Sequence, residues 1–299
     1  MRNFIAVGTF DGVHLGHREV IAELSARARA SGMKSLAVYF PIPPKAFLSG
    51  KPEQSMITLP GERGALLKQC GADAAVSLEF TRGLAAMSCE RFLDEVLVKK
   101  LRAGGILAGQ DFAFGAGRQG HVNWLRRECE TRGIELVVLH FVKAQGHKIS
   151  STQIRQYLHE GLVEEAAELL GRPYSLKGTV VRGKGLGRKL GYPTANLDAG
   201  ACKILPRGVF AVHANVRGER FNAVANIGFR PTVNPIHSHI PLCEVHILDF
   251  MRDIYDEEVE IDFSAKIRNE AKFYNLSELV SGIKADISAV RQLLHCRAG

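Results

Sequence analysis

The stretch Gly8–His17 combines residue types that suit the binding of a polyphosphate. It follows a short apolar run at Phe4–Val7 and precedes a helical pattern. The start of a helix presents unpaired N–H groups and a partial positive charge, which hold phosphate groups. His14 and His17 can both donate hydrogen bonds to phosphate oxygens, and Gly16 between them lets the backbone come close. Because adenylyl transfer depends on positioning and on neutralising charge at the α-phosphate, this stretch indicates a nucleotidyl-transfer site.

A second group of phosphate-binding candidates occurs later in the same half of the chain. Ile149–Arg155 reads Ile-Ser-Ser-Thr-Gln-Ile-Arg and places hydroxyls, N–H groups and one guanidinium at a predicted helix start. Taken alone, this segment is equally typical of an ordinary capping box. Paired with the two histidines, it indicates a second phosphate clamp.

The glycine-rich stretch Gly183–Leu197 is the most informative part of the sequence. A dinucleotide fingerprint needs a strand, a glycine turn and a helix in succession, and Pro193 without a following helical stripe argues against one. A flap whose amides line a triphosphate fits better. Thr194 and Asn196 lie two positions apart in an extended segment, so they project from the same face. Both offer hard oxygen donors, which Mg²⁺ prefers.

Leu242–Phe250 predicts a strand that carries one candidate base. Glu244 and His246 share a face with Leu242 and Leu248. A carboxylate on a partly apolar face can take a proton from a hydroxyl nucleophile. Taken alone, Glu244 is more typical of a solvated strand residue.

The first half alternates short apolar runs with helical periodicity, which predicts an α/β domain with a largely parallel sheet. Helices are predicted after Leu15, along Phe92–Leu101, after Ser150 and along Val163–Leu170. The Gly171–Pro173 break then predicts a boundary between residues 1–171 and 172–299. The predicted strands are Phe4–Val7, Ser35–Phe40, Ala74–Leu78, Gly105–Ala108 and Glu135–Leu139.

The second half predicts a compact antiparallel barrel closed by one helix. Its strands follow one another without long helices between them. Asn275, with Glu278 three residues later, predicts the start of the terminal helix. The predicted strands are Gly178–Val181, Val209–Val216, Phe221–Ile227, Cys243–Phe250 and Val259–Phe263.

Composition bounds the class of protein. The 299 residues allow two domains, and 46% hydrophobic with 23% charged residues is typical of a globular chain. The net charge of +8 suits polyanionic substrates, and equally a basic surface without a partner. No apolar run approaches the ~18 residues of a membrane span. Six scattered cysteines without a C-x-x-C pair predict reduced thiols and a cytoplasmic location.

Three motifs together carry a family resemblance. Gly8–His17, Gly109–Gly115 and Ile149–Arg155, in this order, resemble the FMN adenylyltransferase module of bacterial bifunctional riboflavin kinase/FAD synthetase enzymes. The kinase domain of the same family is resembled by Gly183–Leu197, Pro206–Phe210, Asn226–Thr232, Glu244–Phe250 and Asp253–Asp256. The resemblance covers almost the whole chain. It implies a Rossmann-like α/β nucleotidyltransferase domain of the H-x-G-H type, followed by an antiparallel β-barrel riboflavin kinase domain with a C-terminal helix.

The resemblance also implies two reactions. Riboflavin is phosphorylated to FMN, and FMN is adenylylated to FAD with release of pyrophosphate, with ATP as co-substrate and Mg²⁺ as cofactor. His14 and His17 would contact the ATP phosphates, Glu244 would deprotonate the ribityl hydroxyl, and Thr194 and Asn196 would bind Mg–ATP. Further phosphate-binding candidates are Gly8, Phe10, Asp11, Gly16, Ser151, Thr152, Arg155, Gly183, Gly185, Gly187 and Arg188. The loop lining the nucleotide and flavin would contribute Gly109, Asp111, Phe112, Phe114 and Gly115.

Two positions depart from the family pattern, and two alternatives remain. Phe40–Pro44 reads Phe-Pro-Ile-Pro-Pro where the family often has an acidic-Pro-His-Pro turn, and Asp256 stands where the family has Gly. One alternative is therefore a chain whose adenylyltransferase has decayed. The other is a basic nucleic-acid-binding regulator, which would need a recognition helix or an aromatic-rich face. Trp124 is the only Trp and the basic residues are dispersed, so we expect small-molecule substrates and neither nucleic acid nor membrane as partner. The sequence carries no signal of the oligomeric state.

Overall fold

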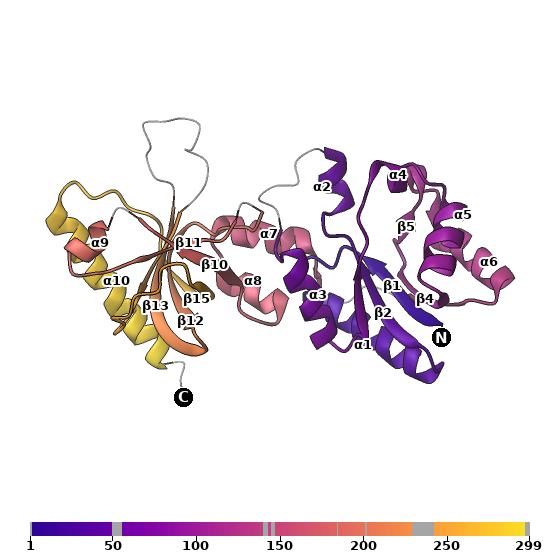
Figure 1. Ribbon diagram of the computed structural model, residues 1–299, viewed down its shortest axis with the longest axis horizontal. Coiled ribbons are helices and arrows are strands. Elements are labelled where there is room, and N and C mark those ends of the chain that lie inside the picture. Colours follow the sequence, from indigo (N-terminus) through magenta and orange to yellow (C-terminus); the bar gives the residue numbers. More distant parts are fainter. Residues whose placement is uncertain are drawn as a thin grey trace. The chain divides into compact units, whose positions relative to one another are not determined.

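The computed structural model describes residues 2–49, 56–139, 143–144, 147–183, 185–200, 202–228 and 242–296. The chain forms two compact units (Figure 1). The first ends at Ser151 and the second begins at Thr152. Lys184 and the second half of the Asn226–Thr232 motif lie outside the described residues.

A five-stranded parallel sheet organises the first unit. Its order is β3 (Ala74–Ser77), β2 (Lys34–Tyr39), β1 (Asn3–Gly8), β4 (Ala103–Gly109) and β7 (Glu135–Leu139). This confirms the five predicted strands to within two residues at each end. Such a sheet must be covered on both faces. Apolar residues of α1 (Leu15–Ala30) and α3 (Pro60–Gln69) cover one face. Those of the π-helix η1 (Phe92–Lys100) and of α6 (Val122–Arg132) cover the other.

The strand order places the carboxyl ends of β1 and β4 side by side. From β1 the sheet grows through β2 on one side and through β4 on the other. The crevice at such a reversal is where open α/β sheets bind ligands. The smaller elements of this unit are α2 (Pro44–Ser49), α4 (Arg82–Ala85), α5 (Cys89–Arg91), β5 (Ala113–Phe114), η2 (Ala116–Arg118), β6 (Gly120–His121), β8 (Lys143–Ala144) and β9 (His147–Lys148).

A closed antiparallel barrel organises the second unit, as predicted. Its order is β10 (Ser175–Val181), β11 (Ala195–Asp198), β14 (Leu242–Ile247), β13 (Glu219–Gly228), β12 (Gly208–Val216) and β15 (Glu258–Arg268). The barrel closes because β15 pairs with both β12 and β10. The terminal helix α10 (Leu276–Cys296) packs Val290 and Leu294 on the barrel. Asn275 Oδ1 accepts from the N–H of Glu278 at 2.9 Å, which confirms the predicted cap.

The structure divides the chain earlier than the Gly171–Pro173 break. Helices α7 (Ser151–Glu160) and α8 (Val163–Leu170) group with the barrel from Thr152 on. The Lys266 ammonium on β15 donates to the carbonyl of Glu160 at 3.0 Å, and α8 packs against the same strand. Both helices have a buried apolar face. The Gly171–Pro173 break ends α8, and the boundary between 171 and 172 stays a prediction.

Candidate active sites

The predicted phosphate turn lies where β1 ends and α1 begins. His14 is the N-cap of α1, and its Nδ1 accepts from the N–H of His17 at 3.3 Å. This bond assigns the proton of a neutral His14 ring to Nε2, which is then a donor. The two rings stack with centroids 3.6 Å apart, and Phe10 packs edge-on against His17 at 5.2 Å. The helix N-terminus and both histidines therefore share one small region.

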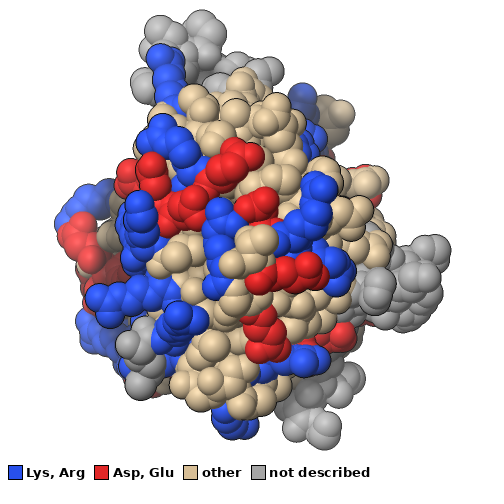
Figure 2. Space-filling view, turned by 90° about the vertical axis from the view of Figure 1, so that its right-hand side faces the viewer, with Lys and Arg blue, Asp and Glu red and all other residues tan. Residues whose placement is uncertain are grey.

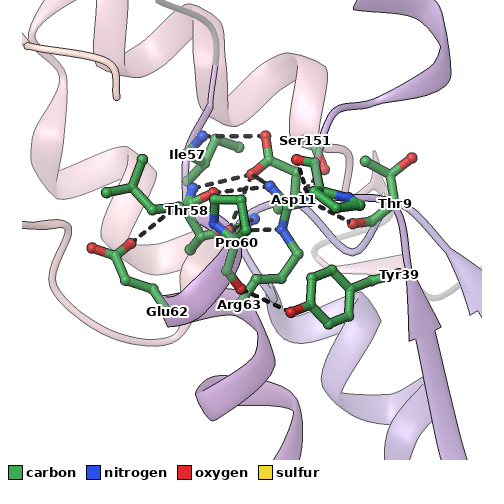
Figure 3. Close-up of polar contacts among 12 residues, drawn as sticks. Thr9, Asp11, Tyr39, Ile57, Thr58, Pro60, Glu62, Arg63 and Ser151 are labelled. Carbon is green, nitrogen blue, oxygen red and sulfur yellow. Dashed lines mark hydrogen bonds and ion pairs between the residues drawn. The ribbon is translucent and has the colours of Figure 1, made fainter. Parts of the chain in front are cut away.

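The turn itself holds an unfavourable backbone conformation. Phe10, Gly12 and Val13 have φ values of 50°, 86° and 41°, and a β-branched residue such as valine rarely adopts this region. Strained backbone persists only where its surroundings determine it. Here those surroundings are a buried polar network centred on Asp11 and Arg63 (Figure 3).

The Asp11 side chain makes its polar contacts inside the unit, and the contact of this residue with phosphate stays a prediction. Its side chain is fully buried and its Oδ1 lies 2.9 Å from Nη2 of Arg63. Its carboxylate also accepts from the N–H groups of Ile57 and Thr58. An anionic side chain committed to these donors supports the turn from behind. Arg63 was not among the sequence candidates, because α3 was not predicted and the burial of Arg63 is seen only in the structure.

The hydroxyl segment Ile149–Arg155 meets this turn through its first helical residue. Ser151 Oγ donates to the carbonyl of Asp11 at 2.9 Å (Figure 3). Thr152 and Arg155 follow in the first turns of α7 and belong to the second compact unit. The structure therefore joins Ser151 to the turn within one unit.

The loop Gly109–Gly115 follows β4 at the same edge of the sheet as the phosphate turn. Phe114 is buried and packs edge-on against Trp124, with ring centroids 5.8 Å apart. A Cβ on Gly115 would lie 2.6 Å from the backbone N of Cys89. Phe114 and Gly115 thus support the loop from the core. Of the predicted loop residues, Asp111 is exposed, Gly109, Phe112 and Gly115 are half-buried, and Phe114 is buried.

A cavity of about 310 Å³ gathers the predicted kinase residues of the second unit. Asn196 on β11 lies opposite Glu244 on β14, and Glu244 lies opposite Asn226 on β13. Three polar side chains therefore form a row across neighbouring strands, and Thr194 lines the same cavity. The apolar wall comes from α10, through Leu279, Ile283 and Ile287.

The glycine-rich flap rests directly on the two predicted metal ligands. A Cβ on Gly183 would lie 2.3 Å from Nδ2 of Asn196. A Cβ on Gly187 would lie 2.4 Å from the Tyr192 carbonyl and 3.2 Å from Oγ1 of Thr194. Only glycine permits this approach. The flap contains a single helical turn, α9 (Leu186–Lys189), which the sequence did not predict.

A second cavity of about 420 Å³ lies beside the first. Its lining includes Tyr255, Pro193 and Arg188, and Arg188 lies over the Tyr255 ring at 5.9 Å. Gly185 and Gly187, in contrast, line the first cavity. Thr194 lines both cavities. The flap and Thr194 therefore lie between the two cavities.

The donor set at this border fits one hard cation. Thr194 and Asn196 offer two neutral oxygens, and Mg²⁺ commonly binds through few protein ligands together with waters and phosphates. Within the residues that the structure describes, no group of three or more His, Cys, Asp and Glu residues is arranged to hold a metal. The site thus suits a cation that arrives with a nucleotide.

Comparison with known proteins identifies the family. The FAD synthetase family matches residues 1–153, and the riboflavin kinase family matches residues 170–294. The chain is 35% identical over 288 residues to the bifunctional riboflavin kinase/FMN adenylyltransferase of Pseudomonas fluorescens, covering 96% of this chain and 91% of that one. The chain belongs to the bifunctional riboflavin kinase/FMN adenylyltransferase family. The Bacillus subtilis member is 34% identical over 288 residues, covering 95% and 90% of the two chains.

The fold of this chain also resembles a solved structure over nearly its whole length. A crystal structure described as a macrolide-efflux protein from Streptococcus pneumoniae superposes with a TM-score of 0.86 at 31% identity. It covers 97% of this chain and 94% of the other. Among the helices described for this family member, none has the length and apolar character needed to cross a bilayer.

Proposed function

We propose that the two sites divide the two reactions of the family. Riboflavin is phosphorylated to FMN in the barrel, and FMN is adenylylated to FAD at the turn after β1. The observation that carries this assignment is the row Asn196–Glu244–Asn226 in one cavity with Thr194. It places a candidate base beside candidate metal ligands, as phosphoryl transfer to an alcohol requires.

In the kinase site the two cavities suit two different substrates. The α10 wall of Leu279, Ile283 and Ile287 suits the flat, largely apolar flavin ring. The neighbouring cavity, with Tyr255 and Arg188, suits a nucleotide. Because Thr194 borders both cavities, the phosphoryl group is transferred beside it.

Each polar group at this border has a distinct role. Glu244 accepts the proton of the ribityl hydroxyl as that oxygen attacks the γ-phosphorus. Thr194 and Asn196 hold Mg²⁺, which neutralises charge on the phosphates when bound. The amides of the flap, including those of Gly183, Gly185 and Gly187, lie above the triphosphate.

The adenylyltransferase site also works by positioning its substrates and neutralising phosphate charge, but it uses no general base. A phosphate oxygen of FMN attacks the α-phosphorus of ATP and pyrophosphate leaves. The N-terminus of α1 attracts the phosphates, and His14 and His17 donate to oxygens on which charge develops. Asp111 and Phe112 lie at the crevice between β1 and β4, where the flavin and the adenine are bound.

The proposed partners are riboflavin, FMN, FAD and ATP, without nucleic acid or membrane. Figure 2 shows basic and acidic residues interspersed on the face in view, which favours small substrates over a nucleic-acid backbone. Five cysteines of the described chain are free thiols, which supports a cytoplasmic location.

The test separates the half-reactions. Purified protein receives either riboflavin or FMN with Mg–ATP, and FMN and FAD are resolved by chromatography. His17→Ala should abolish FAD formation and leave riboflavin phosphorylation close to wild type, because His17 lies beside the phosphate turn in the first unit and the kinase candidates lie in the second. Loss of both activities in a folded His17→Ala protein would contradict two separate sites.

A further inference from the structure

Arg63 is fully buried in the first unit, and its guanidinium contacts several backbone carbonyls and the carboxylate of Asp11 (Figure 3). Nη2 donates to Asp11 and to the carbonyl of Thr58, both at 2.9 Å. Nη1 donates to the carbonyl of Phe40 at 2.6 Å and to that of Thr9 at 3.2 Å. A charge is held in the interior in this way only where its donors are nearly all satisfied.

These bonds join three segments of the candidate adenylyltransferase site. Thr9 and Asp11 belong to the strained phosphate turn, and Phe40 begins the loop after β2. Thr58 lies two residues before α3. Its hydroxyl accepts from the N–H of Gly12 at 3.0 Å and donates to Asp11 at 3.1 Å. One guanidinium therefore sets the spacing between the turn and the neighbouring loop.

We propose that Arg63 is a positioning residue for adenylyl transfer. By fixing the backbone of the turn against the loop after β2, it aims the turn's amides, His14 and His17 at the phosphates. The inference rests on the proposed assignment of this turn to ATP. Lysine cannot replace Arg63 in this role, because a single ammonium lacks the planar fork that reaches Asp11 and two carbonyls on separate segments.

The first test is Arg63→Lys, which keeps the charge beside Asp11. We expect kcat for FAD formation to fall by about 10- to 100-fold, since small misplacements of binding groups have effects of this size. Riboflavin phosphorylation in the same preparation should stay within twofold of wild type. The matched control is Arg132→Lys, in the same unit, where Arg132 pairs with Asp94 at 2.9 Å on a more exposed surface.

The fluorescence of Trp124 separates positioning from mere stabilisation. Trp124 is the only Trp in the chain and packs in the first unit against Phe114, so its emission counts folded copies of this unit. A purely structural role would lower that fraction and leave kcat per folded unit unchanged. A wild-type kcat per folded unit in Arg63→Lys would overturn the proposal.

Thr58→Val decides the matter if Arg63→Lys does not fold. It removes the hydroxyl that accepts from the N–H of Gly12 and from Nε of Arg63 and that donates to Asp11. The ion pair between Asp11 and Arg63 remains in place. We expect kcat for FAD formation to fall about tenfold, within the range for misplaced binding groups, and an unchanged rate would overturn the proposal. His17→Ala runs in parallel. If His17→Ala retains FAD formation, the turn is not the ATP site and the proposed function fails. If His17→Ala loses FAD formation while the Arg63 and Thr58 variants keep it, only the proposed role of Arg63 fails.

Discussion

Replacing Glu244 by glutamine should slow riboflavin phosphorylation by about 10²- to 10⁴-fold, the usual contribution of a positioned base. Glu244 lies opposite Asn196 on one neighbouring strand and Asn226 on the other, so glutamine preserves the strand pairing and the shape of the cavity. It cannot accept the proton of the ribityl hydroxyl. The lost stabilisation of the transition state corresponds to about 3 to 5 kcal/mol. Because the side chain is only half-buried, the free energy of unfolding should change by less than about 1 kcal/mol.

The assay compares initial rates of FMN formation at saturating riboflavin and Mg–ATP, with nucleotide affinity measured separately. Adenylylation of supplied FMN by the same preparation is the internal control and should not change. The matched variant is Glu258→Gln, in the same barrel, where the exposed Glu258 pairs with Lys177; its rates should stay within twofold of wild type. A Glu244→Gln enzyme that keeps more than about a tenth of the wild-type kinase kcat would refute the assignment of the base.

Three further predictions follow from the second unit. Asn196→Ala should weaken Mg–ATP binding along with kinase turnover, because it removes a metal-ligand candidate; unchanged affinity in a nucleotide titration would count against that role. Residues 172–299 should fold alone and make FMN, since the barrel is closed and carries α10; an insoluble fragment beside an active fragment 152–299 would move the boundary to Thr152. Burial raises the pKa of the Cys243 thiol to about 12, so it stays protonated at pH 8 and should resist iodoacetamide in the folded protein, which mass spectrometry checks. Alkylation of Cys243 before unfolding would contradict this.

The parallel strands and the motifs were predictable because their signals are local. Strands buried on both faces are near-continuous apolar runs, as in β1 and β2, and the motifs are contiguous segments. Helix α3 was not predicted, since Pro60, Gly61 and Gly64 weaken the local helical signal. It forms because Arg63 and Leu67 are buried against the rest of the unit.

Sequence alone determined the two-part architecture, the family and the short segments that carry the chemistry. Only the tertiary structure decided which side chains line a cavity and which are buried away from it. Asp11 and Arg63 are 52 positions apart, and their pairing exists only once the sheet brings both segments together. In the same way, strand register places Glu244 between Asn196 and Asn226. Such contacts between distant segments have no counterpart in local residue patterns, because they depend on the energy of closing long loops and burying both partners together.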